Sequence, residues 1–158
     1  MKRYDILAKK KESGGLIMIK GIAHAAVTVR DMEESLRFYM QALGFQNAFQ
    51  ILHPETGKPW IIYLGICPGQ FLELFYGGKK ENPWEDTQIG FDHLCFEVDD
   101  IFAAVQRVLE AGYPIDVQPQ QGSDHNWQAW VKDPNGVRIE LMQIMQESPQ
   151  AQFHFQEI

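Results

Sequence analysis

GIAHAAVTVRD at residues 21–31 and GFDHLCFEVDD at residues 90–100 are two copies of one pattern, and this pattern decides the fold. A glycine opens each copy and a histidine follows three positions later, so that His24 and His93 are separated by 93 − 24 = 69 positions. Self-similarity at a fixed spacing indicates a duplicated supersecondary unit. We therefore expect two modules of the same construction.

An amphipathic stretch follows each copy and predicts a helix, because its apolar residues recur at helical spacing. An aspartate precedes each stretch, where its side chain can accept hydrogen bonds from the first backbone N–H groups. A glycine follows each stretch, where a left-handed residue commonly ends a helix. The expected caps are Asp31 and Asp100, and the expected closing glycines are Gly44 and Gly112.

Each predicted helix is followed by runs that favour strands. The runs are WIIYLGI (60–66) and QFLELFYG (70–77) in the first half, then WQAWVKD (127–133) and VRIELMQIM (137–145) in the second. Each half therefore reads as a strand, a helix and two or three strands, which predicts an α+β fold. A sheet with its helix on one face leaves the other face free, so two such units side by side would enclose a cleft.

The predicted organisation is one domain with short additions at both ends. We assign an extension at 1–17, a domain at 18–146 and a tail at 147–158. Within the domain, the modules cover about 18–77 and 88–145, and a polar connector, GGKKENPWEDTQ, joins them.

Composition limits the functional classes. A chain of 158 residues with 45% hydrophobic residues suits one compact domain with its own core. No apolar run approaches the roughly 20 residues that cross a bilayer, and no secretory signal opens the chain, so we expect no membrane partner and a cytoplasmic location. A formal net charge of −7 repels a phosphate backbone, so we expect no nucleic-acid partner.

Two glutamates repeat in the same way as the two histidines. Glu73 in FLELF follows His24 by 73 − 24 = 49 positions, and Glu140 in RIELM follows His93 by 140 − 93 = 47 positions. An ionised carboxylate between apolar strand residues is costly unless something compensates its charge. We predict that all four side chains bind one divalent metal ion, namely Ni, Zn, Co, Mn or Fe. Taken singly, each histidine also fits a hydrogen-bonded role and each glutamate a solvated one.

Alternation along the strands also predicts which residues border the metal ion. Residues two apart share a face, so the neighbours of the predicted ligands point the same way. The expected substrate-binding residues on these faces are Phe71, Phe75, Phe91, Met142 and Arg138, and Trp130 or Trp127 is expected to close one side of the cleft. Ordinary core packing is the alternative role for the apolar members.

Three segments resemble the glyoxalase or vicinal oxygen chelate superfamily: IKGIAHAAVTVRDMEESLRFYMQALGF (19–45), FDHLCFEVDD (91–100) and KDPNGVRIELMQ (132–143). The resemblance extends from about Met18 to Ile144 and is closest to glyoxalase I (lactoylglutathione lyase)-like proteins. It implies two tandem βαβββ modules that form a cup-shaped mixed sheet around the metal. It also implies a homodimer, in which each site is often built from two chains.

The resemblance implies a metal-dependent lyase or isomerase that converts a small α-oxygenated carbonyl compound through an enediolate. Glu140 or Glu73 would move the proton, and Glu140 is the favoured base. Thr28 and Gly77 stand where bacterial glyoxalase I is expected to hold glutathione with arginine and asparagine, which argues against the glutathione adduct. Arg30 and Arg138 are candidates to replace them. The alternatives are a metal-dependent epimerase, an extradiol-type dioxygenase and a non-catalytic drug-binding protein of the same fold.

Overall fold

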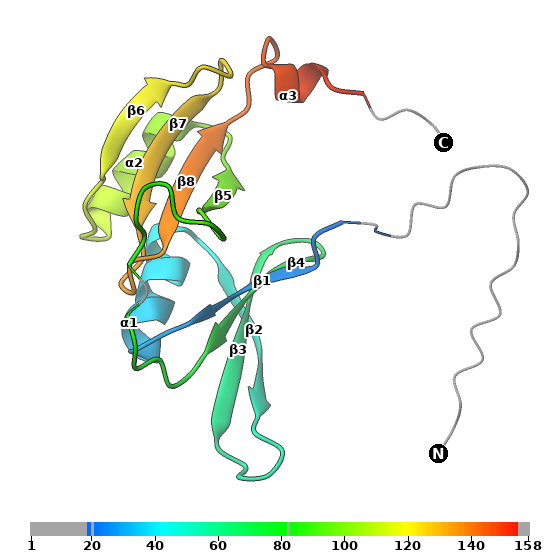
Figure 1. Ribbon diagram of the computed structural model, residues 1–158, viewed down its shortest axis with the longest axis vertical. Helices are drawn as coiled ribbons and strands as arrows, with labels where there is room; N and C mark the ends of the chain where they lie inside the picture. The colour runs from blue at the N-terminus through cyan, green and yellow to red at the C-terminus, as the bar shows by residue number, and fades with distance from the viewer. Residues whose placement is uncertain (1–18, 20, 82, 155–158) are drawn as a thin grey trace, which may run out of the picture.

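A computed structural model describes residues 19, 21–81 and 83–154 (Figure 1). The predicted α+β fold class is confirmed, since each module runs as a strand, a helix and three strands. The first module contains β1 (His24–Thr28), α1 (Met32–Arg37), the π-helix η1 (Phe38–Ala42), β2 (Gln46–Leu52), β3 (Pro59–Cys67) and β4 (Gln70–Phe75). The second contains β5 (Leu94–Glu97), α2 (Ile101–Glu110), β6 (Val117–Gln121), β7 (Trp127–Lys132) and β8 (Arg138–Gln143).

The ends of the chain add little to these modules. A short helix, α3 (Pro149–Gln152), lies within the predicted tail, and the predicted extension at 1–17 lies outside the described residues. Throughout 21–81 and 83–154, every helix is too short or too polar to serve as a membrane span.

The two modules have the same sheet topology. Their strand orders are β1-β4-β3-β2 and β5-β8-β7-β6, with the first two strands of each order parallel and the others antiparallel. Ala26 on β1 pairs with Glu73, and Cys95 on β5 pairs with Glu140. His24 lies two residues before Ala26, and His93 lies two residues before Cys95. Because side chains two apart share a face, each histidine points to the same side of its sheet as the glutamate. This topology brings each histidine beside the glutamate of its own module.

The predicted helix ends are confirmed. Asp31 accepts a hydrogen bond from the Glu34 amide at 3.0 Å, and Asp100 accepts from two amides at 2.9 and 3.0 Å. Gly44 and Gly112 adopt φ values of +81° and +88°, the left-handed region that glycine enters without steric cost. One difference is that the first helix widens into η1 after Arg37, whereas the sequence predicted a continuous helix.

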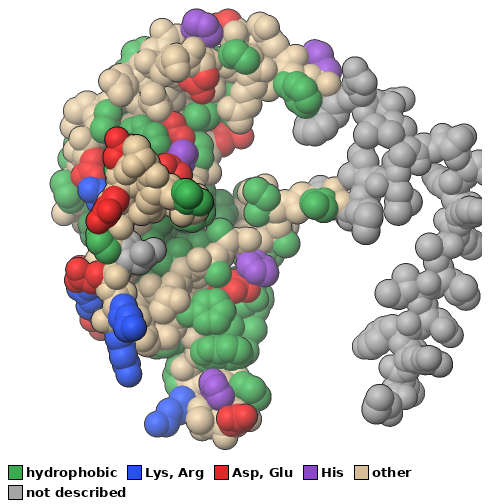
Figure 2. Space-filling view, viewed as in Figure 1, with side chains coloured by type: hydrophobic (Ala, Val, Ile, Leu, Met, Phe, Trp, Pro, Cys, Tyr) green, Lys and Arg blue, Asp and Glu red, His purple; other side chains and the backbone are tan. Residues whose placement is uncertain are grey.

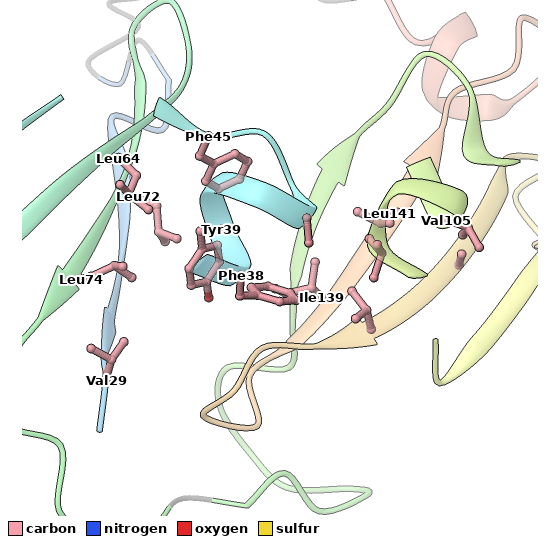
Figure 3. Close-up of a cluster of buried hydrophobic side chains, with 14 of the residues drawn as sticks. Val29, Phe38, Tyr39, Phe45, Leu64, Leu72, Leu74, Val105, Ile139 and Leu141 are labelled. Carbon is pink, nitrogen blue, oxygen red and sulfur yellow. The ribbon is translucent and has the colours of Figure 1, made fainter. Parts of the chain in front are cut away.

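The modules share one hydrophobic core rather than having one each. Figure 3 shows Phe38, Tyr39 and Phe45 between strand residues of the first sheet, such as Leu72, and strand residues of the second, such as Ile139. Phe38 and Tyr39 are consecutive yet fully buried, because their helix is covered from both sides.

The shared core determines where the glutamates point. Leu72 and Leu74 face the core from β4, and Ile139 and Leu141 face it from β8. Because side chains alternate along a strand, the glutamate between each of these pairs of residues points away from the core. The two glutamates therefore lie on the outer faces of their sheets.

Candidate metal centre

The first module holds one pair of predicted ligands, His24 and Glu73, which we call the first pair. Nε2 of His24 lies 3.5 Å from Oε1 of Glu73. The Glu73 side chain is only 7% exposed, while that of His24 is 48% exposed. A buried carboxylate therefore lies beside a half-exposed imidazole.

Tyr63 adds a third polar group to the first pair. It lies on β3 directly opposite Glu73, and a hydrogen bond to the Glu73 carboxylate raises the pKa of the Tyr63 phenol. Its ring also meets the His24 ring edge-on, with 6.3 Å between centroids. Tyr63 could not be identified from the sequence, because its place opposite Glu73 depends on the register between β3 and β4.

The second module holds His93 and Glu140, the second pair. Nε2 of His93 lies 3.1 Å from Oε2 of Glu140, and the Glu140 side chain is 7% exposed. Cys95, the strand neighbour of Glu140, has its thiol pKa raised to about 12 by desolvation first and the Glu140 carboxylate second. The thiol therefore stays protonated at neutral pH.

Asp92 brings a second carboxylate to His93. Its Oδ1 atom lies 2.7 Å from Nδ1 of His93 and accepts a hydrogen bond from Arg138 at 3.0 Å. Its Oδ2 atom accepts from the Trp84 indole at 3.3 Å. The hydrogen bond with His93 is the largest cause that lowers the pKa of Asp92, and Trp84 and Arg138 act in the same direction. Sequence reasoning missed Asp92, although it directly precedes the histidine.

The donor groups of the second pair fit a divalent cation. Carboxylate oxygens lie next to both ring nitrogens of His93, but a neutral imidazole carries only one proton. If Nδ1 donates to Asp92, the Nε2 lone pair faces Glu140 and both groups can act as ligands. Imidazole nitrogen and carboxylate oxygen are donors that Zn, Ni, Co, Fe and Mn accept.

The two pairs do not meet within one chain. Among the residues that the structure describes, no group of three or more histidine, cysteine, aspartate or glutamate side chains is arranged to hold a metal ion. The structure thus brings His24 to Glu73 and His93 to Glu140, and it does not bring all four together.

Of the predicted substrate-binding residues, two lie near the first pair and two lie beside the second. In the first module, Phe71 packs near Tyr63 with 6.2 Å between ring centroids, and Phe75 meets Trp60 at 5.8 Å. Figure 2 shows hydrophobic side chains gathered over the region where Figure 1 places β2, β3 and β4. Phe49, stacked on Tyr63 at 4.4 Å, extends this aromatic surface. The face of the first pair is therefore largely aromatic.

In the second module, Trp130 meets the His93 ring edge-on at 4.8 Å. The Arg138 guanidinium lies 3.8 Å from the Trp84 ring centroid and 4.7 Å from that of Trp130. Met142, in contrast, contacts the buried Asn126 amide through its sulfur at 3.6 Å. Arg138 and Trp130 thus lie beside the second pair.

A cavity of about 660 Å³ adjoins Asp92. It lies between β1, the connector and the start of β8, and Phe91, Thr28, Arg30 and Arg138 are among its lining residues. Phe91 is 63% exposed, so it borders this cavity rather than filling a core position.

Comparisons with known proteins identify the family of the chain. A model of the Glyoxalase/Bleomycin resistance protein/Dioxygenase superfamily matches residues 21–141. A probable lactoylglutathione lyase from Vibrio parahaemolyticus is 32% identical over 136 residues, which cover 80% of this chain and 93% of that protein. An ethylmalonyl-CoA/methylmalonyl-CoA epimerase from Cereibacter sphaeroides is 29% identical over 136 residues, covering 80% of this chain and all (100%) of the epimerase.

A solved structure is similar as well. The glyoxalase family protein from Enterococcus faecalis is 25% identical, has a TM-score of 0.64 and covers 78% of this chain and 98% of its own. The likeness therefore includes both modules and not one of them alone.

Proposed function

Because this chain belongs to the glyoxalase/bleomycin resistance protein/dioxygenase superfamily, we propose that it is a metal-dependent lyase or isomerase of the glyoxalase I type. Its substrate is a small carbonyl compound with a hydroxyl or carbonyl oxygen on the adjacent carbon. One observation supports this most directly: two buried glutamates, Glu73 and Glu140, each lie beside a histidine nitrogen at equivalent positions of two equivalent sheets.

The complete centre, in this proposal, lies between two copies of the chain. The first and second pairs face away from the shared core, and together they supply the four predicted ligands. In the described part of the chain, β1 and β5 each lie at a sheet edge without a further strand beside them. Such edges offer free backbone groups to a second chain. In a twofold dimer, the first pair of one copy meets the second pair of the other, which gives two equivalent centres.

Glu140 is the proposed base. A divalent cation bound by the four ligands supplies Lewis-acid stabilisation of negative charge on the substrate oxygens. Glu140 takes a proton from one substrate carbon and returns it to the neighbouring carbon. Its side-chain neighbours are His93 and the weak thiol donor Cys95, whereas the Tyr63 hydroxyl also holds Glu73. Glu73, which has the stronger donor group beside it, suits a lasting ligand role.

The surroundings favour a small substrate other than the glutathione adduct. Phe71 and Phe75 offer apolar contacts on the first sheet, while Trp130 and Arg138 offer an aromatic face and a cation on the second. Thr28 lines the cavity at a position where an arginine would be expected to hold glutathione.

Metal analysis of the purified protein is the first test. We expect a divalent metal ion at close to one equivalent per chain, and activity that a chelator removes and added metal restores. Hemithioacetals, acyl-CoA epimers and catechols should then be assayed in parallel. A protein that stays metal-free and does not respond to added divalent cations would refute the proposal.

The substitution Glu140→Gln tests the assigned base. It keeps the size of the side chain but removes its basicity, so we expect turnover to fall by about 10²- to 10⁴-fold while substrate binding is largely retained. Glu110→Gln, on the exposed side of α2, is the matched control and should leave turnover unchanged. Normal turnover in the Glu140 variant would contradict the assignment.

An epimerase is the second candidate, because one relative is an ethylmalonyl-CoA/methylmalonyl-CoA epimerase. Epimerisation also needs a base to remove a proton from carbon, but the proton returns to the same carbon. The parallel assays separate the two reactions, and oxidation of catechols or tight binding without turnover would instead indicate a dioxygenase or a drug-binding protein.

A further inference from the structure

His24 and His93 hold equivalent places, but in the described part of the chain only His93 has a partner for its second ring nitrogen. Nδ1 of His93 lies 2.7 Å from Asp92, whereas among the described residues His24 has no hydrogen-bond partner at Nδ1. The residue before His24 is Ala23, so the first copy of the repeat has no acid at this position. The two copies of the repeat therefore differ in sequence at the residue before the histidine.

We propose that Asp92 is a positioning residue, which holds His93 in the tautomer that keeps Nε2 free to bind a cation. This inference rests on the proposed metal-dependent function. A neutral imidazole exists in two tautomers, and a carboxylate at Nδ1 selects the one with the proton on Nδ1. It also limits rotation of the ring and increases the basicity of the other nitrogen. Nε2, which lies 3.1 Å from Glu140, is then the nitrogen that is free to act as a ligand.

The inter-module connector holds Asp92 in turn. Trp84, within the connector, donates its indole N–H to Asp92 at 3.3 Å and stacks its ring on Arg138. Arg138 donates to Asp92 at 3.0 Å while its guanidinium lies between Trp84 and Trp130. An arginine between two aromatic rings keeps its planar donors oriented. The Asp92 side chain is 58% exposed, so hydrogen bonds from Trp84, Arg138 and His93, rather than burial, hold it in position.

The experiment compares Asp92→Ala, Asp92→Asn and Trp84→Phe with a matched control, Asp116→Asn. Asp116 is also a partly exposed acid in an ion pair, with Lys132 at 3.2 Å, but it does not contact His93. The first readout is the tautomer of His93 in the metal-free protein, from nitrogen-15 NMR at about pH 9, where histidine is ordinarily neutral. We expect the Nδ1–H form in the unsubstituted protein and the control, and a shift toward the Nε2–H form in Asp92→Ala.

The second readout is Co²⁺ affinity, measured from visible absorbance. We expect Asp92→Ala to weaken binding by about 10- to 100-fold, Asp92→Asn and Trp84→Phe to weaken it less, and the control to match the unsubstituted chain. An unchanged tautomer and unchanged affinity in Asp92→Ala would overturn the inference. If Asp92→Ala does not fold, the other two variants decide by the same readouts. If no protein binds Co²⁺, the metal proposal fails, and the tautomer alone decides whether Asp92 positions His93.

Discussion

The two modules repeat one topology, yet they surround their ligand pairs with different chemistry. The first pair, 3.5 Å apart, lies on an aromatic face and has the Tyr63 hydroxyl at its carboxylate. The second pair, 3.1 Å apart, lies among charges, with Asp92 and Arg138 beside its histidine. The histidine and glutamate occupy equivalent positions in the two modules, while their neighbours differ. We expect the halves to contribute unequally to metal affinity and to proton transfer.

The largest expected effect comes from separating the two pairs. One variant carries His24→Ala with Glu73→Ala, and the other carries His93→Ala with Glu140→Ala. Each alone should lose metal-dependent activity, because every centre lacks two ligands. Mixed dimers, formed by co-expression, contain one centre with an intact first pair from one copy and an intact second pair from the other. Activity should therefore return in the mixture alone.

The control for this experiment is each double variant expressed alone, which forms dimers of one kind of chain only. If the mixed dimers stay inactive although both chains are present in equal amounts, the centre is not shared between copies. If one double variant is active by itself, a single pair suffices and the comparison of the modules must be revised.

Much of this comparison was available from the sequence. The repeated glycine and histidine and the apolar residues around Glu73 and Glu140 predicted both modules and their opening and closing strands. The helix caps could also be predicted, because Asp31 and Asp100 accept hydrogen bonds from amides only a few residues away. Local signals of this kind do not depend on how distant segments meet.

What the sequence did not reveal depends on distant segments. β6 reads as VQPQQ, where Pro119 and the polar residues give little strand signal at a sheet edge. Tyr63 lies beside Glu73 because of the register between β3 and β4, and Trp84 reaches Arg138 because the connector folds back on β8. A pattern along the sequence predicts neither contact. The shared core was also unforeseen, and it separates the two pairs within one chain.

The next prediction compares a tyrosine in the shared core with one beside the first pair. Tyr39 is fully buried and donates to Asp133 of the second module at 3.0 Å, while Asp133 also accepts from the Val137 amide. Tyr39→Phe removes a buried hydrogen bond to a carboxylate and leaves Oδ2 of Asp133 with the Asn135 amide alone, so it should lower the free energy of unfolding by about 1–3 kcal/mol. Tyr63→Phe, at a half-buried position, should lower it far less. Urea unfolding followed by circular dichroism measures both.

The same tyrosine predicts a pH dependence. Desolvation by burial, followed by the Asp133 charge, raises the pKa of Tyr39 well above its ordinary value. The folded chain therefore keeps this proton at a pH where the unfolded chain loses it, so the stabilisation is complete below about pH 10 and declines at higher pH. Tyr39→Phe should show a smaller decline. An equal decline in both proteins would show that Tyr39 does not dominate the alkaline loss of stability.

The smallest expected effect compares the glycines that close the two helices. Gly44 and Gly112 have nearly the same positive φ, so alanine at either should cost about 1–2 kcal/mol of backbone strain. At Gly112 an added Cβ meets nothing within 4 Å, but at Gly44 it would lie 3.1 Å from the Arg107 guanidinium, which donates to the Gln41 carbonyl at 3.0 Å.

Gly44→Ala should therefore cost about 1 kcal/mol more than Gly112→Ala, since Arg107 must move and give up this hydrogen bond. Urea unfolding of both variants measures the difference, and repeating the pair in an Arg107→Ala background should remove it. Equal costs in the unsubstituted background would show that the guanidinium moves aside without losing the hydrogen bond. In that case the contact between η1 and α2 does not distinguish the two helix ends.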